Sequence, residues 1–194
     1  MTDETKSPAT PRTQLGRAEW IAGATELMAE RGIDGLRVEV LAKELGVTKG
    51  SFYWHFKDRQ DLLEGILEIW RNGRLRDIEK QTAATPGKER NQLLHLIEVY
   101  SAARNRKGIA IELAIRDWAR RDAATRAIVE EVDTYRLECT RRLYRSSGYD
   151  EQEAKARSVL LYAYVFGQSL MIYDKFDSKI PALKEWLAER ITDR

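Results

Sequence analysis

The chain has 194 residues, of which 43% are hydrophobic and 33% are charged, and its formal net charge is +2. This composition is typical of a globular protein with an ordinary core, and no stretch approaches the roughly 20 apolar residues that cross a membrane. A single cysteine excludes an intrachain disulfide, and the polar start MTDETKSPATPRT lacks the pattern of a secretory signal. We therefore expect a cytoplasmic protein without a membrane partner.

The N-terminal part is predicted to be a polar arm followed by three helices. Residues 1–12 contain two prolines and few apolar side chains, so we expect a disordered arm. Apolar residues then recur at helical spacing over 13–31, and a glycine follows. A second, short helix is expected over 38–45, and Thr48 can cap a third. These three helices make residues 13–57 a first domain.

Residues 58–194 are predicted to form a helical bundle, because glycine and proline are rare and no strand-like alternation stands out. Asp58 opens a long fourth helix, with Asp61 three positions later in an arrangement like a capping box. The sequence TPG at 85–87 ends it. Five further helices are expected, over 89–105, 109–120, 123–146, 150–174 and 181–192. The predicted fold class is all-α, with about nine helices.

The stretch LAKELGVTKGSFYWHF, residues 41–56, has the pattern of a helix-turn-helix. Two short helices joined by a tight turn can place the second in the major groove of DNA. Ala42 supplies the small residue that such packing requires, and Gly46 tolerates the positive φ of the turn. Val47 and Phe52 supply apolar contacts after the turn and on the second helix. Together, at this spacing, these residues predict a DNA-binding motif.

The residues of the second helix that are not needed inside are candidate DNA contacts. Residues 1–57 carry as many acidic as basic side chains, but 47–57 contain two lysines, a histidine and no acid. Hydroxyl and backbone N–H groups at a helix start suit phosphate, and Lys49 can reach a guanine edge or a phosphate. Gly50 leaves room for the helix to approach the groove. Phe56, like Phe52, is assigned to the core. The predicted DNA-binding residues are Arg37, Thr48, Lys49, Gly50, Ser51, Tyr53, Trp54, His55 and Lys57; for Trp54, packing is an equal alternative to contact.

The run LGVTKGSFYWHFKDRQDLL resembles the DNA-binding domain of TetR-family regulators, the tetracycline-repressor type. The match covers about residues 13–65 and is much weaker over 80–194. It implies a reader of double-stranded DNA followed by a helical domain that dimerises and binds a small-molecule effector. The start of the second helix departs from the family, which often has a capping Thr or Ser where this chain has Leu36 and Arg37. We expect Arg37 to bind phosphate and Asp34 to supply the lost cap.

The resemblance also implies a ligand pocket among the middle helices and a dimer interface on the last two. Aromatic residues at helical spacing are more often core than a ligand cage; for the apolar stripes of the last helices a dimer interface is favoured, and internal core is the alternative. The candidate pocket residues are Trp70, Tyr100, Trp118, Tyr135, Tyr162 and Phe166. The candidate dimer residues are Leu160, Ala163, Gly167, Leu170, Leu183, Trp186 and Leu187.

The favoured function is a homodimeric repressor that a small molecule releases from a palindromic operator. The alternatives are an activator, a regulator controlled by a protein partner, or a helical small-molecule-binding protein without DNA function. His55 and His95 have no metal-ligand spacing to Cys139, and Cys139 itself is expected to be a buried thiol rather than a redox sensor. No catalytic motif is visible, so we expect no metal, no cofactor and no enzymatic activity.

Overall fold

The computed structural model describes residues 15–101, 106–171, 175–176 and 179–193. Within these ranges the chain forms nine helices and no strand, which confirms the predicted all-α class. The predicted arm, residues 1–12, lies outside the described residues. The helices are α1 (Arg17–Gly35), α2 (Val38–Glu44), α3 (Lys49–Phe52), α4 (Arg59–Thr82), α5 (Glu89–Ser101), α6 (Arg106–Ala119), α7 (Ala123–Ser146), α8 (Glu151–Leu170) and α9 (Ile180–Thr192).

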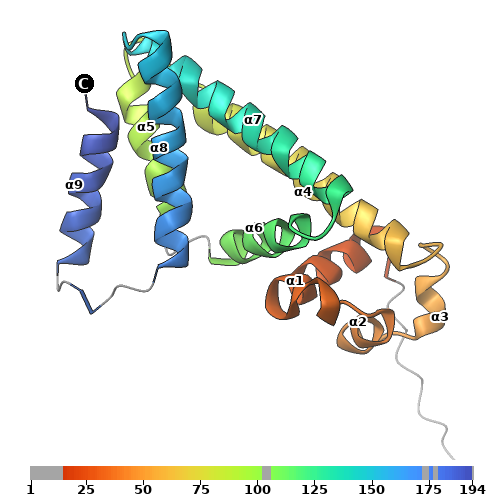
Figure 1. The fold of residues 1–194 in the computed structure, drawn as a ribbon. Coiled ribbons are helices and arrows are strands. Elements are labelled where there is room, and N and C mark those ends of the chain that lie inside the picture. Colours follow the sequence, from red (N-terminus) through yellow and green to blue (C-terminus); the bar gives the residue numbers. More distant parts are fainter. Residues whose placement is uncertain (1–14, 102–105, 172–174, 177–178, 194) are drawn as a thin grey trace, which may run out of the picture.

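The helices are arranged along a long axis that α4 and α7 share (Figure 1). At one end, α1, α2 and α3 gather around the start of α4. At the other end, α5, α8 and α9 pack together with the last part of α7. The short helix α6 lies between the two ends, in contact with both α1 and α7. No helix in the described part of the chain is long and apolar enough to cross a membrane.

Each end of the molecule is stabilised by its own hydrophobic cluster. The first cluster joins α1 to α4 with α6 and the first part of α7, and it includes Trp20, Phe52, Trp70 and Trp118. The second cluster joins α5, the last part of α7, α8 and α9. The first cluster therefore does not stop at residue 57, the predicted end of the first domain. The helix-turn-helix domain packs directly on α6.

Several helix ends differ from the sequence prediction. The first helix begins at Arg17, not at Thr13, and a further helical turn to Gly35 follows the left-handed Gly32, which has a φ of 69°. The eighth helix ends at Leu170. The expected cap by Asp34 is wrong, because Arg37 is the N-cap of α2 without a side-chain cap hydrogen bond, and the Asp34 carboxylate accepts from Arg121 instead. Asp34 is drawn away by an ion pair with an arginine far along the chain.

Candidate nucleic-acid interface

The one-turn helix α3 is anchored by aromatic residues on its inner side. Phe52 is fully buried, with its ring edge-on to Trp20 at a centroid distance of 5.5 Å and stacked on Phe56 at 5.0 Å. Ala42 is buried on α2, and its carbonyl oxygen accepts a hydrogen bond of 2.9 Å from the N–H of Val47. This bond and the left-handed turn before it fix the direction in which α3 leaves α2. The structure thus confirms that Phe52 and Phe56 are core residues.

The predicted DNA-contacting residues lie on the outer side of the same elements. Trp54 is 78% exposed, so the alternative that it packs in the core is wrong. A Cβ on Gly50 would meet only the Thr48 hydroxyl oxygen, at 3.8 Å, so the fold does not require glycine there. The exposed residues are Arg37, Thr48, Lys49, Gly50, Tyr53, Trp54 and Lys57, and the partly buried ones are Ser51 and His55.

The hydroxyl groups at the start of α3 form hydrogen bonds within the first turn of that helix. Thr48 is the N-cap, and its hydroxyl oxygen accepts a bond of 3.3 Å from the N–H of Ser51. The Ser51 hydroxyl donates back to the Thr48 carbonyl oxygen at 2.7 Å. In this conformation the Ser51 hydrogen is therefore committed to the cap, whereas the Thr48 hydroxyl hydrogen can still point outward to an acceptor.

The sequence analysis missed an acidic residue beside α3. Glu39, in the first turn of α2, forms an ion pair with Lys49 at the start of α3. The hydrogen bond from Lys49 holds the pKa of Glu39 below its usual value, and the same bond raises the pKa of Lys49. Among the described residues, no carboxylate forms an ion pair with Arg37 or Lys57. The pair joins residues ten positions apart on two helices, and no helical repeat in the sequence indicates it.

The sequence analysis also missed Arg17 of α1, which connects the residues after α3 to the start of α4. Its guanidinium donates to the His55 carbonyl oxygen at 2.6 Å and to the Asp61 carboxylate at 2.8 Å, and it lies over the Phe56 ring at 4.3 Å. The hydrogen bond from Arg17 lowers the pKa of Asp61, as does a bond of 3.0 Å from the N–H of Lys57. The end of the reader is thereby fixed to the start of α4.

Ion pairs connect the reader domain to α6. Arg121, just after α6, donates to Asp34 of α1 at 2.8 Å and to Asp117 of α6 at 2.7 Å. At the other end of α6, Lys107 pairs with Glu26 of α1. Because α6 also belongs to the first hydrophobic cluster, a shift of α6 is expected to move α1 with it.

The five candidate pocket residues whose side chains are described do not form one cage. Trp70 and Trp118 are buried in the first hydrophobic cluster, whereas Tyr162 and Phe166 belong to the second. Tyr100 lies in α5, but its side chain is outside the described residues. Tyr162 and Phe166 lie together, at a ring-centroid distance of 6.2 Å. The single-cage expectation fails because side chains at helical spacing on long helices face different neighbours along their length.

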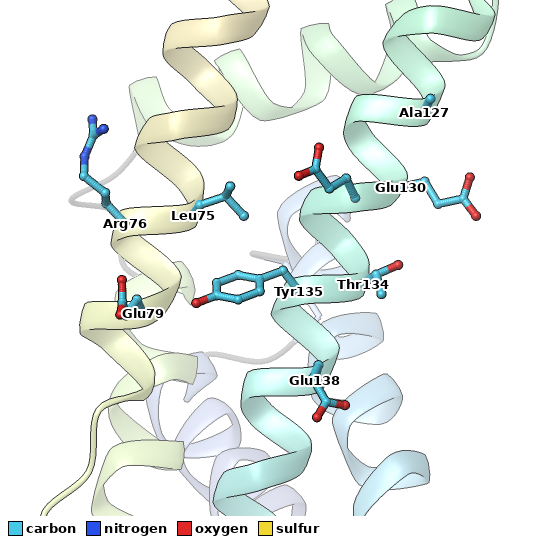
Figure 2. Close-up of a pocket in the computed structure, with 9 residues that line it drawn as sticks. Leu75, Arg76, Glu79, Ala127, Glu130, Thr134, Tyr135 and Glu138 are labelled. Carbon is cyan, nitrogen blue, oxygen red and sulfur yellow. The ribbon is translucent and has the colours of Figure 1, made fainter.

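Tyr135 lies in a surface groove between α4 and α7 (Figure 2). Figure 2 shows its ring reaching from α7 toward α4, beside Glu79. The groove has a volume of about 750 Å³ and is open to solvent on one side. Glu131 in its lining is paired with Arg71, and Glu138 is paired with Arg141. Tyr135 is therefore separate from the Tyr162 and Phe166 pair.

Next to Tyr162 and Phe166 lies a network of charges that is buried at Glu112 and Arg136 and partly exposed at Arg116 and Asp133. Arg136 is 1% exposed and donates to Asp133 at 2.9 Å and to Glu112 at 3.3 Å. Arg116 donates to the same carboxylates at 2.6 and 2.8 Å, and its guanidinium lies over the Phe166 ring at 4.3 Å. Burial opposes the charge on Arg116, but the bond to Asp133 and the charge of Glu112 raise its pKa overall. These four charged groups thus pair with one another between α6 and α7.

The candidate dimer residues are mostly uncovered. Trp186 is 52% exposed, and Leu160 and Leu170 are exposed as well, so for these three the internal-core alternative is wrong. A Cβ on Gly167 would meet no atom within 4 Å. A largely apolar groove of about 440 Å³ lies between α8 and α9, and its lining includes Ala163, Gly167, Leu183 and Leu187. Whether a second copy covers this surface stays a prediction.

Comparisons with known proteins agree with the helix-turn-helix. Residues 21–66 match the family described as bacterial regulatory proteins, tetR family. The tetracycline repressor protein class A from transposon 1721 of Escherichia coli is 32% identical over 122 residues, which are 63% of this chain and 51% of that protein. The chain thus spans about half the length of this curated relative.

Solved structures agree over most of the chain. A transcriptional regulator from Rhodococcus sp. Rha1 has a TM-score of 0.69 at 19% identity and covers 92% of both chains. The multidrug binding protein EbrR, complexed with malachite green, has a TM-score of 0.65 at 21% identity and covers 91% of this chain and 95% of its own. These likenesses show that most of the chain shares one fold with these proteins. Residues 21–66 are thus similar to the tetR family of bacterial regulatory proteins.

Proposed function

We propose that the chain is a sequence-specific DNA-binding transcriptional regulator that acts as a homodimer and responds to a small-molecule effector. The observation that carries this proposal is the division of the α3 region into two sides. Phe52 and Phe56 fix it to the core, while Lys49, Tyr53 and Trp54 are exposed on the outer side, although Lys49 pairs with Glu39 and the Tyr53 ring also lies edge-on to Phe52. A rigid short helix with polar, basic and aromatic groups outward suits the major groove.

Dimerisation would give this small reader its affinity and match it to a two-fold symmetric operator. The exposed apolar residues of α8 and α9 support a dimer through these helices, because a contiguous apolar surface of this kind commonly marks an interaction site. In Figure 1 this surface lies at the opposite end of the molecule from α3. Two copies joined there would hold their two readers apart, each free to enter one half-site.

The effector is proposed to bind between α6, α7 and α8, near Phe166 and the buried charges. The name of the related EbrR structure, a multidrug binding protein with malachite green, supports a ligand-binding role for this fold. Because α6 contacts both this region and α1, an effector that prefers a shifted α6 would move the reader. Such coupling amounts to about 1–3 kcal/mol in typical cases. Release of a repressor from DNA in the cytoplasm is the simplest outcome, and activation is the alternative.

The proposal is tested by mixing the purified chain with fragmented genomic DNA of its source organism at rising salt concentration. The DNA fragments that stay bound to the chain are then sequenced. We expect a short two-fold symmetric site that survives near physiological salt. Salt-labile binding with no common site would refute the regulator and favour a helical ligand-binding protein without DNA function.

Two matched variants sharpen this test. Lys57→Gln should weaken binding to all sequences alike and reduce the salt slope by about 1, as loss of a phosphate contact does. Lys80→Gln removes the same charge at the far end of α4 and should leave binding unchanged. Equal effects of the two variants would mean that only net charge, not the α3 region, attracts DNA.

A further inference from the structure

Glu39 is an acidic side chain in a place where DNA binding should disfavour one. It lies in the first turn of α2, and its side chain remains 62% exposed although it pairs with Lys49 of α3, which is 49% exposed. Exposed ion pairs contribute little to stability, so holding α2 to α3 does not by itself account for a carboxylate here. The phosphates of bound DNA would repel it.

The pair brings two complementary groups to one point of the reader. An ammonium donates hydrogen bonds and a carboxylate accepts them, and α2 and α3 hold the two within contact distance of each other. In the major groove, guanine presents two acceptors, N7 and O6, and cytosine presents a donor, the N4 amino group. On the major-groove edge of a G·C pair, this N4 amino group is the only strong hydrogen-bond donor that a carboxylate can accept from. A phosphate offers a carboxylate no donor.

We propose that Glu39 reads a cytosine by accepting a hydrogen bond from its N4 amino group, while Lys49 donates to a guanine of the same or the neighbouring base pair. This inference rests on the proposed DNA-binding function and adds a specificity-determining residue to it. On binding, the Glu39–Lys49 contact is exchanged for contacts with the two bases. The carboxylate then contributes to the choice of sequence, while it costs affinity on sites that lack the cytosine.

The inference is tested with the operator obtained by selection. Each base pair of one half-site is replaced in turn, and affinities are measured by fluorescence anisotropy at fixed salt for the wild type, Glu39→Gln and Glu44→Gln. Glu44 is the matched control, because it is an exposed glutamate of the same helix that pairs with Arg31 of α1 instead of with α3. Melting temperatures of the three proteins establish equal folding.

We expect the wild type to lose about tenfold in affinity when one particular C·G pair is replaced, within the range typical of a direct base contact. Glu39→Gln should reduce this discrimination to less than about twofold at that position alone. Its salt slope should stay unchanged, because no phosphate contact is lost. Glu44→Gln should match the wild type at every position.

Two results would overturn the inference while leaving the proposed function intact. In one, Glu39→Gln shifts the affinity equally for every replaced operator, which means that Glu39 only positions Lys49 or repels phosphate. In the other, Glu39→Gln has the wild-type profile. If the wild type itself has no discrete site, the proposed function and the inference both fail.

Discussion

Gly46 and Gly50, four residues apart in the helix-turn-helix, should respond to alanine with opposite signs. Gly46 has a φ of +68°, and a Cβ built on it would meet no atom within 4 Å. Its requirement for glycine is therefore one of backbone conformation alone. Gly50 is helical, and its Cβ would make an ordinary contact of 3.8 Å with the Thr48 hydroxyl oxygen. Nothing in the fold requires glycine at that position.

The magnitudes follow from these two environments. An L-residue in the left-handed region lowers the free energy of unfolding by about 1–2 kcal/mol. The unfolded chain of Gly46→Ala has less conformational entropy, which raises the free energy of unfolding by about 0.4–1 kcal/mol. The net loss is about 1 kcal/mol. Gly50→Ala should instead gain about 0.8–1 kcal/mol from helix propensity. For a chain of this length, 1 kcal/mol corresponds to a melting temperature change of about 2–4 °C.

The assay is thermal unfolding followed by far-ultraviolet circular dichroism at one protein concentration, because a dimer melts at a concentration-dependent temperature. Gly46→Asn is the internal control, since asparagine tolerates the left-handed region better than alanine and should lose less. A melting temperature that moves in the same direction for Gly46→Ala and Gly50→Ala would refute the reasoning, as would a Gly46→Asn variant less stable than Gly46→Ala.

Further predictions concern binding, assembly and coupling. Gly50→Gln should keep the wild-type melting temperature within about 2 °C yet lower operator affinity at least about tenfold, because its side chain would occupy the space needed by the groove; unchanged affinity would remove Gly50 from the interface. Trp186→Arg should turn the dimer into a monomer in sedimentation analysis, and a dimer that persists would exclude this surface. Arg121→Ala, which breaks the pair with Asp34, should weaken the effect of an effector on DNA binding, while effector affinity measured without DNA stays within about twofold. An unaltered effect would mean that this ion pair does not couple α6 to α1. Glu112→Leu should destabilise the chain by about 3 kcal/mol in urea unfolding, since it leaves buried arginine charges with one carboxylate fewer; a neutral result would mean that the network does not need it.

Local features of the fold were predictable from the sequence, because short-range geometry determines them. Thr48 caps α3 and Asp58 caps α4 as their positions indicate, and the left-handed Gly46 and buried Phe52 lie where the motif requires them. Each of these residues is specified by neighbours within a few positions, so spacing alone carries the information.

Contacts between distant elements were not predictable in the same way. The pair of Asp34 and Arg121 joins residues 87 positions apart, and it depends on how α6 packs on α1. Sequence reasoning assigned Asp34 to a helix cap because it could weigh only the nearby alternative. For the same reason it gathered Trp70 and Tyr162 into one pocket, although the two belong to different hydrophobic clusters.

The sharing of one hydrophobic cluster by α1 and α6 limits how the two halves of the chain can be exchanged between proteins. Ile115 and Trp118 of α6 lie in the same cluster as Trp20 of α1. A chimaera joined after residue 57 would set foreign side chains against α1 and leave apolar surface mismatched, even though the sequence motif ends there. A reader transplanted together with the matching α6 face should be accepted more readily, so recombination in this architecture is expected to preserve α1 and α6 as a unit.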